Sequence, residues 1–337
     1  MKSKHQQGSA LIAVLALLFT AGILTTATVS LSKMGSFDMA SHLDLQRSMY
    51  IMEGAANRIK YLVAADTNNF PGESLGYTNY EEYTHDRYLA DGVEHYLDYY
   101  GTPLKFSVND AFGGLNFTAE NYRNTLSMLK NNYIDDLNWT EELDILQKRI
   151  DDYEDSDDEA QDDSMETAEY EELGQSPLPR QDQFQFREEL LWIPGFRDII
   201  PPDKDGRLSR IRLIPPEGTV NELRARMPSL FTADMFILRT YTSLSEENAQ
   251  LVLDALEKWR TDREPLEDAL DAEVLSALSN LSANDSGYYT VKIEPDRREN
   301  PSQVSRRLVF SYENFPIGGP ENQTLKYLEW MYINSHV

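Results

Sequence analysis

Carboxylate side chains are concentrated between residues 151 and 159, where the sequence reads Asp-Asp-Tyr-Glu-Asp-Ser-Asp-Asp-Glu. Clustered carboxylates are suitable ligands for hard divalent cations, and Ca²⁺ takes about six to eight oxygen atoms in a flexible geometry. The spacing is not that of an EF-hand loop. Blocks of like charge also form solvated acidic linkers, so the residues alone leave both a cation site and a linker open.

The residues needed for common enzyme chemistries are not gathered in any recognisable pattern. The sequence has no glycine-rich phosphate loop and no His-Glu-x-x-His helix, and the absence of cysteine removes thiolate nucleophiles and thiolate metal sites. Five histidines are scattered along the chain: His5, His42, His85, His95 and His336. We therefore expect a protein that is not an enzyme. An acidic hydrolase stays open only because a carboxylate pair could be chosen almost anywhere.

The charge of the chain is strongly acidic. Among 337 residues, 57 are Asp or Glu and 31 are Lys or Arg, which gives a formal net charge of -26. Such a charge repels phosphate backbones, so we expect no nucleic-acid partner. Residues 191–195, Leu-Trp-Ile-Pro-Gly, are similar to the turn of a helix-hairpin-helix DNA-binding motif. Acidic residues surround them, however, and we expect a packing turn between two helices.

The N-terminal part of the sequence contains an apolar segment at residues 10–29, and no charged residue occurs from position 8 to position 32. A helix of roughly 20 apolar residues crosses a hydrocarbon core about 30 Å thick. Lys2 and Lys4 precede this segment, and a long polar remainder follows it. The positive-inside rule therefore predicts a single membrane span with the body of the protein exported.

Two kinds of processing are compatible with this N-terminus. A cleaved secretory signal peptide has the same basic and apolar regions, and residues 25–27, Thr-Thr-Ala, would then hold the cleavage site. The apolar region is long for a signal peptide, however, and the step from Gly8 to Ser9 stands before it. Cleavage after Gly8 would make Ser9 the new N-terminus and would keep the apolar helix as an anchor.

Residues 8–18, Gly-Ser-Ala-Leu-Ile-Ala-Val-Leu-Ala-Leu-Leu, resemble the leader junction of type IV prepilins, which a prepilin peptidase cuts. Most members of that family carry a glutamate at the fifth mature position, where this sequence has Ala13. A carboxylate in hydrocarbon is costly unless it is paired, so a subunit with nothing stacked above it is better without one. The segment is similar to the K-type minor pseudopilin of the type II secretion system (general secretion pathway protein K), whose members also lack the glutamate.

The resemblance implies a single-pass protein of the inner membrane, with its C-terminal body in the periplasm and a methylated N-terminus at Ser9. Its partners would be the I-type and J-type minor pseudopilins, the inner-membrane platform of the secretion system and the prepilin peptidase. Together they would cap the pseudopilus tip and initiate its assembly, for protein export across the outer membrane. A minor pilin of a type IV pilus, and a signal-peptidase-processed periplasmic calcium-binding protein, remain alternatives.

The resemblance extends to the acidic block. In the K family an Asp-Trp-x-Asp-x-Asp-Asp pattern precedes Gly-Ala-Glu-x-x-Tyr and Glu-Leu-x-x-x-x-Gly, and calcium binds in this region. Residues 152–158, 167–170 and 189–195 follow the same order, with Tyr153 at the tryptophan position and Thr167 at the glycine position. The resemblance therefore implies calcium ligands at these five residues: Asp155, Asp157, Asp158, Glu169 and Asp182.

Periodicity indicates the elements that would position these residues. Apolar residues at three- and four-residue steps predict a helix over residues 36–65. Alternation around an Asp/Gly turn predicts a β-hairpin within residues 106–117, and two β-branched runs predict antiparallel strands at 288–293 and 307–312. Helices are predicted at 122–133, 139–150, 188–192, 220–226, 246–262 and 265–279, with N-caps at Thr140 and Ser245.

The expected fold class is α+β: a long N-terminal pilin-like helix packed on a small antiparallel sheet, with a large mainly helical domain inserted between strands. We expect a prepilin leader at residues 1–8, the transmembrane part of the helix at 9–32 and its soluble part at 33–66. The pilin-like β domain would comprise residues 67–118 and 285–337. The inserted helical domain would comprise residues 119–284 and contain the acidic cation-binding loop.

Overall fold

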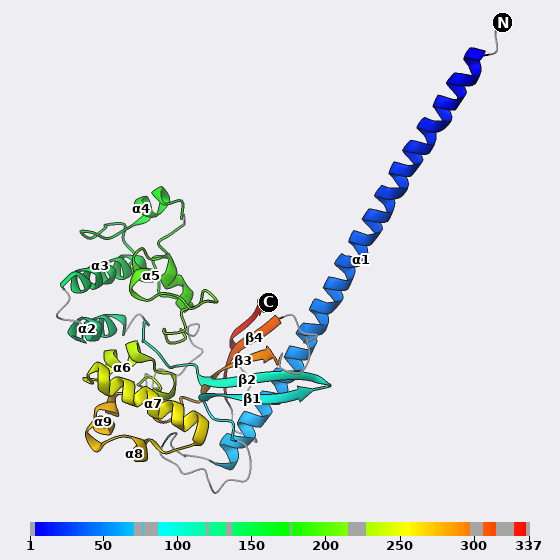
Figure 1. Cartoon of the computed structure of the whole chain (residues 1–337). Coiled ribbons are helices and arrows are strands. Elements are labelled where there is room, and N and C mark those ends of the chain that lie inside the picture. The colour runs from blue at the N-terminus through cyan, green and yellow to red at the C-terminus, as the bar shows by residue number, and fades with distance from the viewer. Residues whose placement is uncertain are drawn as a thin grey trace, which may run out of the picture.

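The N-terminal helix α1 (Lys4–Asn69) is continuous over 66 residues and extends far from the rest of the molecule (Figure 1). The computed structural model describes residues 4–70, 76, 87–118, 121–132, 137–175, 177–214, 227–296, 306–314 and 327–334. The large apolar side chains between Leu11 and Leu31 are exposed. Among the described residues, α1 is the one helix long and apolar enough to cross a membrane.

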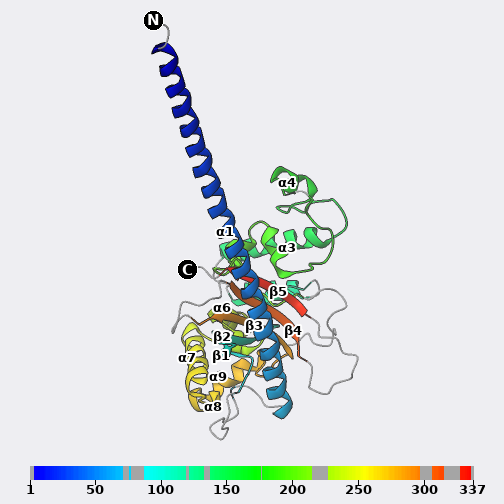
Figure 2. The same ribbon diagram turned by 90° about the vertical axis from the view of Figure 1, so that its right-hand side faces the viewer.

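The second half of α1 packs against the sheet (Figure 2). Met52, Ala56, Ile59 and Val63 are buried at steps of three and four residues, as the periodicity predicts. They share a core with strand side chains, among them Leu104, Phe106, Val108, Val291, Ile293, Leu308 and Phe310. The predicted helix over residues 36–65 is thus confirmed, and it continues to Asn69.

The sheet has five strands, all antiparallel, in the order β1-β2-β3-β4-β5. The strands are β1 (Asp91–Tyr99), β2 (Thr102–Asp110), β3 (Tyr288–Pro295), β4 (Arg306–Glu313) and β5 (Tyr327–Asn334). β2 and β3 are hydrogen-bonded neighbours that align Val108 with Val291, although residues 111–287 separate them in sequence. A helix and an antiparallel sheet with further helices confirm the expected α+β class.

The predicted hairpin within residues 106–117 is wrong. β2 ends at Asp110, and Leu115 instead forms a parallel bridge with Ile211, outside the sheet. The reason lies in the carboxylate of Asp110, which accepts hydrogen bonds from the backbone N–H groups of Phe112 (2.7 Å) and Ser286 (2.6 Å). These bonds turn the chain away from the sheet before a returning strand can form. The strands at 288–293 and 307–312 are confirmed as β3 and β4, whereas β1 and β5 are not among the predicted strands.

The segment between β2 and β3 forms two apolar cores. The first core draws on the elements α2 (Tyr122–Asn132), α3 (Leu137–Glu154), α4 (Thr167–Glu172), η1 (Arg187–Trp192) and α5 (Phe196–Ile199). The second draws on η3 (Leu230–Thr232), α6 (Met235–Tyr241), α7 (Glu246–Asp262), α8 (Leu266–Ala269), α9 (Ala272–Ala277) and η4 (Leu278–Asn280). In Figure 1 these helices lie to the left of the sheet, whereas α1 crosses the sheet and its N-terminal half extends to the upper right.

Most of the predicted helices are present, with two corrections. α7 has its predicted bounds, and the hydroxyl of Ser245 caps it by accepting a hydrogen bond from the N–H of Asn248 (3.2 Å). The predicted cap at Thr140 is wrong, because α3 begins at Leu137 and Thr140 lies inside it. Residues 265–279 form α8, α9 and η4 instead of one helix, since the backbone is extended at Leu270 and at the following residue. The predicted helix at 220–226 lies outside the described residues.

Candidate metal centre

The acidic block begins inside α3. The helix continues to Glu154, so that Asp151 and Asp152 belong to its last turn. The C-terminus of a helix carries a partial negative charge, which favours cations and disfavours carboxylates. No basic residue occurs in the last turn of α3. The helix therefore ends in an electrostatically unfavourable concentration of negative charge, which a bound cation would relieve.

Aromatic side chains fix the backbone on both sides of this block. Tyr153 is fully buried and stacks on Phe184, with ring centroids 5.3 Å apart. Tyr153 also meets Tyr170 of α4 edge-on, at a centroid distance of 6.3 Å. Because these rings hold α3 and α4 together, the intervening loop returns on itself. Glu166, the residue before α4, is thereby brought to the end of α3. Figure 1 shows α4 at the end of the helical segment remote from α7 and α8.

Three carboxylates meet at this point: Asp152 of α3, Asp155 just after it, and Glu166. One oxygen atom of each lies within 4.8 Å of the corresponding atoms of the other two. Asp152 and Asp155 are three residues apart and therefore lie on the same side of the helix end. Asp152 is fully buried, and its carboxylate accepts hydrogen bonds from the backbone N–H (2.8 Å) and the side-chain amide of Gln161.

Three of the other oxygen atoms of this acidic triad lack donors. Glu166 is only 3% exposed, and neither of its carboxylate oxygens has a hydrogen-bond partner; the same holds for Oδ1 of Asp155. No Lys or Arg of the described residues forms an ion pair with the triad. The nearby Lys148 and Arg149 donate to backbone carbonyls instead. Burying an unpaired carboxylate is costly, so the arrangement calls for protons or for a cation.

The pKa values of the site show the cost of burying these unpaired carboxylates. Burial, followed by the charges of Asp152 and Asp155, raises the pKa of Glu166 to about 7. Burial, followed by the charges of Asp157 and Asp152, also raises the pKa of Asp155. Burial raises the pKa of the adjacent Glu154 to about 7. Close to neutral pH the folded protein therefore holds protons that a metal ion would displace.

The donor set fits a hard divalent cation. All three members of the triad are carboxylates, and no histidine belongs to it. Oxygen ligands suit Ca²⁺, Mg²⁺ or Mn²⁺ better than the softer transition metals. Asp152, Asp155 and Glu166 would hold such an ion, whose charge would satisfy the orphaned oxygens. Such an ion would have a structural role, because it would connect the end of α3 to the start of α4.

Of the five ligands that the resemblance implies, Asp155 alone belongs to this triad. The remaining four are exposed: Asp157, Asp158, Glu169 and Asp182. The carboxylates of Asp157 and Asp182 accept hydrogen bonds from backbone N–H groups of their own loops. The carboxylate of Glu169 accepts one from the N–H that precedes α4 (2.9 Å) and so supports the helix start.

Sequence reasoning missed Asp152 and Glu166. The density of charge draws attention to residues 155–158, whereas burial selects the residues of the triad. A signal for Asp152 was present, because it stands next to Tyr153 in the buried stripe of α3 and three residues before Asp155. Glu166 carried no such signal, since its approach to α3 depends on how the loop between them closes.

The remaining candidate residues lie elsewhere. Gly8 and Ser9 are part of the first turns of α1, and Ala13 is exposed. His85 lies outside the described residues, and the ring of His95 packs against those of neighbouring aromatic residues. Residues 193–195 form the turn between η1 and α5. This turn needs glycine, because Gly195 has a φ of 85°.

Residues 72–76, Gly-Glu-Ser-Leu-Gly, match the letters of the hydrolase motif Gly-x-Ser-x-Gly, a match that sequence reasoning missed. All of them except Gly76 lie outside the described residues. In hydrolases a strand precedes this motif and a helix follows it. Here the nearest described elements are α1, which ends before it, and β1, which begins after it. The surrounding elements therefore differ from those of a nucleophile turn.

No protein-family model matches the sequence, and a search of curated proteins finds no match either.

Proposed function

We propose that this chain is a minor pseudopilin of the K type, made as a prepilin, cut after Gly8 and methylated at Ser9. The observation that carries the proposal is the Gly-Ser step in front of an apolar segment that continues, within one helix, into a half packed on an antiparallel sheet. A signal peptide is removed and needs no such continuity. A membrane anchor whose helix also packs in the core of the folded body does need this continuity.

The topology supports the finer features of the proposed fold. β2 and β3 are adjacent in the sheet, yet the chain between them builds two separate apolar cores. We propose that residues 119–284 form a domain inserted into a pilin-like β domain of residues 67–118 and 285–337. The insertion gives the subunit a bulk beside the sheet that would obstruct another subunit from stacking above it.

Ala13 supports a position at the tip of the pseudopilus. An ionised carboxylate at this depth in hydrocarbon would cost several kcal/mol if nothing neutralised it. A subunit at the tip has no neighbour above it to supply a neutralising amine, and Ala13 avoids the cost. In this role the protein acts mechanically and without catalysis. It joins the I-type and J-type minor pseudopilins on the inner-membrane platform and starts assembly of the pseudopilus.

We further propose that the acidic triad binds calcium in the periplasm. Its buried, unpartnered oxygens support a cation, and their spread over a helix end, a loop and a second helix start suits the flexible coordination of Ca²⁺. Asp152, Asp155 and Glu166 would supply carboxylate ligands, with carbonyl or water oxygens completing the shell. The calcium ion would order the inserted domain.

The N-terminus of the mature protein tests the proposal directly. The chain should be expressed with and without the cognate prepilin peptidase, and its membrane fraction analysed by intact mass and terminal peptide sequencing. We expect a peptidase-dependent start at Ser9 that carries one methyl group. Gly8→Val should abolish this cleavage, whereas Gly22→Ala, at an open position of the same helix, should leave it intact. A soluble product that starts near Thr28 would refute the prepilin class.

The place in the assembly needs a second experiment. We expect the full chain to co-purify with the I-type and J-type minor pseudopilins, and its deletion to stop secretion. If deletion instead removes surface pili and leaves secretion unchanged, the chain belongs to a type IV pilus. Labelled antibodies should bind one end of isolated pseudopili, so labelling along the whole length contradicts the tip position.

A further inference from the structure

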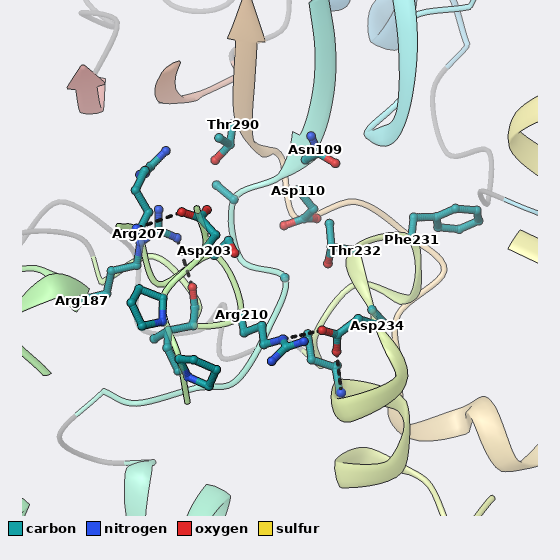
Figure 3. A pocket seen from close by; sticks show the side chains of 18 of the residues that line it. Asn109, Asp110, Arg187, Asp203, Arg207, Arg210, Phe231, Thr232, Asp234 and Thr290 are labelled. Carbon is teal, nitrogen blue, oxygen red and sulfur yellow. Dashed lines mark hydrogen bonds and ion pairs between the residues drawn. The ribbon is translucent and has the colours of Figure 1, made fainter. Parts of the chain in front are cut away.

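A cavity of about 650 Å³ lies between the sheet and the helical segment (Figure 3), and no member of the acidic triad lines it. Its walls come from Asn109 and Asp110 at the end of β2, from Thr290 of β3, from the loop at residues 201–211 and from the region of η3 and α6. Pockets for small molecules measure about 300–1,000 Å³ and occur preferentially between structural units. The cavity therefore has the size and position of a ligand site.

Arginine side chains line this cavity in a chain that is otherwise strongly acidic. Four of them contribute to its walls: Arg187, Arg207, Arg210 and Arg260. Three aspartates accompany them: Asp110, Asp203 and Asp234. Charge alone does not distinguish a ligand site from a network of internal ion pairs. The hydrogen bonds that each group already makes do distinguish them.

The aspartates of the cavity already accept hydrogen bonds from the protein. The carboxylate of Asp110 accepts from the backbone N–H of Phe112 and from both the N–H and the hydroxyl of Ser286. Asp203 accepts from two N–H groups of its own loop, and Asp234 accepts from an N–H at the start of α6 (3.0 Å). Both oxygens of Asp110 and of Asp234 therefore already have donors, whereas Asp203 uses only Oδ1.

Two of the arginines keep donors that no described residue accepts. The Nε atom of Arg210 donates to Oδ2 of Asp234 (2.5 Å), which leaves both terminal nitrogens without a described acceptor. The side chain of Arg210 is 41% exposed, and Asp234 holds it at the cavity wall (Figure 3). Arg207 pairs with Glu329 through one terminal nitrogen, and its buried Nε has no partner. By contrast, Arg260 donates to two backbone carbonyls.

We propose that the cavity binds a small organic acid, whose carboxylate accepts hydrogen bonds from the two terminal nitrogens of Arg210. A guanidinium group offers two parallel donors that match a carboxylate, and charge-assisted bonds of this type are strong. Arg207 adds a second positive charge at the same cavity. A bound acid would connect the sheet to the helical segment. The inference does not depend on the proposed role in pseudopilus assembly.

The test compares a dicarboxylate with its neutral isostere on the full chain in detergent micelles, by isothermal titration calorimetry in a buffer free of divalent cations. We expect saturable binding of succinate and binding of succinamide that is weaker by about tenfold or more. Arg210→Gln should weaken succinate binding by about tenfold, and Arg210→Lys by less, because lysine keeps the charge and loses the paired donors. Arg123→Gln is the matched control, since Arg123 lies on α2 and is 64% exposed.

Three results would each overturn the inference. They are the absence of saturable succinate binding at millimolar concentrations, equal affinity for succinate and succinamide, and unchanged affinity in the Arg210→Gln protein. Circular dichroism should verify that the variants fold. If Arg210→Gln does not fold, the comparison of succinate with succinamide on the unmodified chain decides the question, because it requires no substitution.

Discussion

Replacing Glu166 with glutamine should stabilise the cation-free protein and remove most of the stabilisation that a divalent cation provides. Glu166 is buried, its two oxygens have no donors, and one of them lies within 4.8 Å of oxygens from Asp152 and Asp155. Glutamine has nearly the same shape and removes the charge. Without a cation, the variant should therefore be more stable than the wild type at a pH where Glu166 is ionised. With a saturating cation, it should lose most of the stabilisation that the wild type gains.

The magnitude follows from the geometry. Two unit charges 4.8 Å apart repel by about 3.5 kcal/mol at an effective dielectric constant of about 20. The rise in the pKa of Glu166 from 4.5 to about 7 corresponds to about 3 kcal/mol. Because this pKa is raised, the contribution of Glu166 to stability is present below pH 4.5 and is lost as pH rises through about 7. Measurements at pH 8 therefore show the full effect, roughly 6–12 °C in melting temperature for a domain of this size.

The assay is thermal unfolding of the full chain in detergent micelles at pH 8, in a chelator and then in excess calcium. Calcium at about 100 times its dissociation constant should stabilise the wild type by about 2.7 kcal/mol and Glu166→Gln by less than half of that. Glu169→Gln is the matched control: Glu169 is exposed and lies outside the triad, and glutamine keeps a side-chain oxygen that can accept the backbone N–H of Glu166. We expect its effect to stay within about 0.5 kcal/mol.

Either of two outcomes would show that the triad is not the cation site. In one, Glu166→Gln melts at the same temperature as the wild type in chelator and responds equally to calcium. In the other, Glu169→Gln abolishes the calcium effect. Glu169, which the family resemblance implies, would then be the calcium ligand in place of Glu166, which the geometry selects.

Three further predictions concern the packing, the pH dependence and the anchor. Tyr153→Ala should lower the free energy of unfolding by about 3–5 kcal/mol in urea and weaken calcium binding, because it removes the ring that stacks on Phe184 beside Asp152. Tyr153→Phe should leave the stability and the calcium binding unchanged, since the buried hydroxyl of Tyr153 has no hydrogen-bond partner. The carboxyl carbon of Asp110 should titrate near pH 6 in ¹³C NMR, because burial raises the pKa of Asp110 to about 6. About 3 kcal/mol of stability should be lost as pH rises from about 4 through 6. A titration near the ordinary pKa of 3.8 would contradict this prediction. Leu18→Arg should cost about 2.5–3.5 kcal/mol of membrane insertion and reduce the carbonate-resistant fraction of the protein, whereas Ser41→Arg, farther along α1, should not.

Secondary structure was predicted best where residues within one element determine its bounds. The bounds of α7 follow from Ser245, whose hydroxyl caps the first turn, and from the apolar stripe that ends at Trp259. The soluble half of α1 likewise follows from its own periodicity. The prediction of a hairpin at residues 106–117 failed because a contact distant in sequence decides the local structure. The alternation is real, but Asp110 bonds to Ser286, which lies 176 residues away, and no local pattern reveals such a contact.

The candidate site was predictable as a region and not as a set of ligands. Carboxylate density pointed to the part of the chain that holds the candidate triad, since Asp155 belongs to it. Density cannot separate exposed from buried carboxylates, and the two triad members that it missed, Asp152 and Glu166, are the buried ones. Glu166 reaches the site because Tyr153 and Tyr170 meet across the loop. An aromatic contact between two helices therefore determines which acid joins the candidate site.

The separation of the cores determines what a cation at the triad can control. Tyr153 and Tyr170 belong to the core of α2, α3 and α5, whereas the buried face of α1 belongs to the core of the sheet. Because the triad is attached to the first core alone, loss of the cation should loosen α3 and α4 and leave the sheet protected. Hydrogen exchange in chelator should therefore increase at residues 150–170 and remain unchanged in β2 and β3. Increased exchange throughout the sheet would mean that the cation stabilises the whole body, and the two cores would then unfold as one cooperative unit.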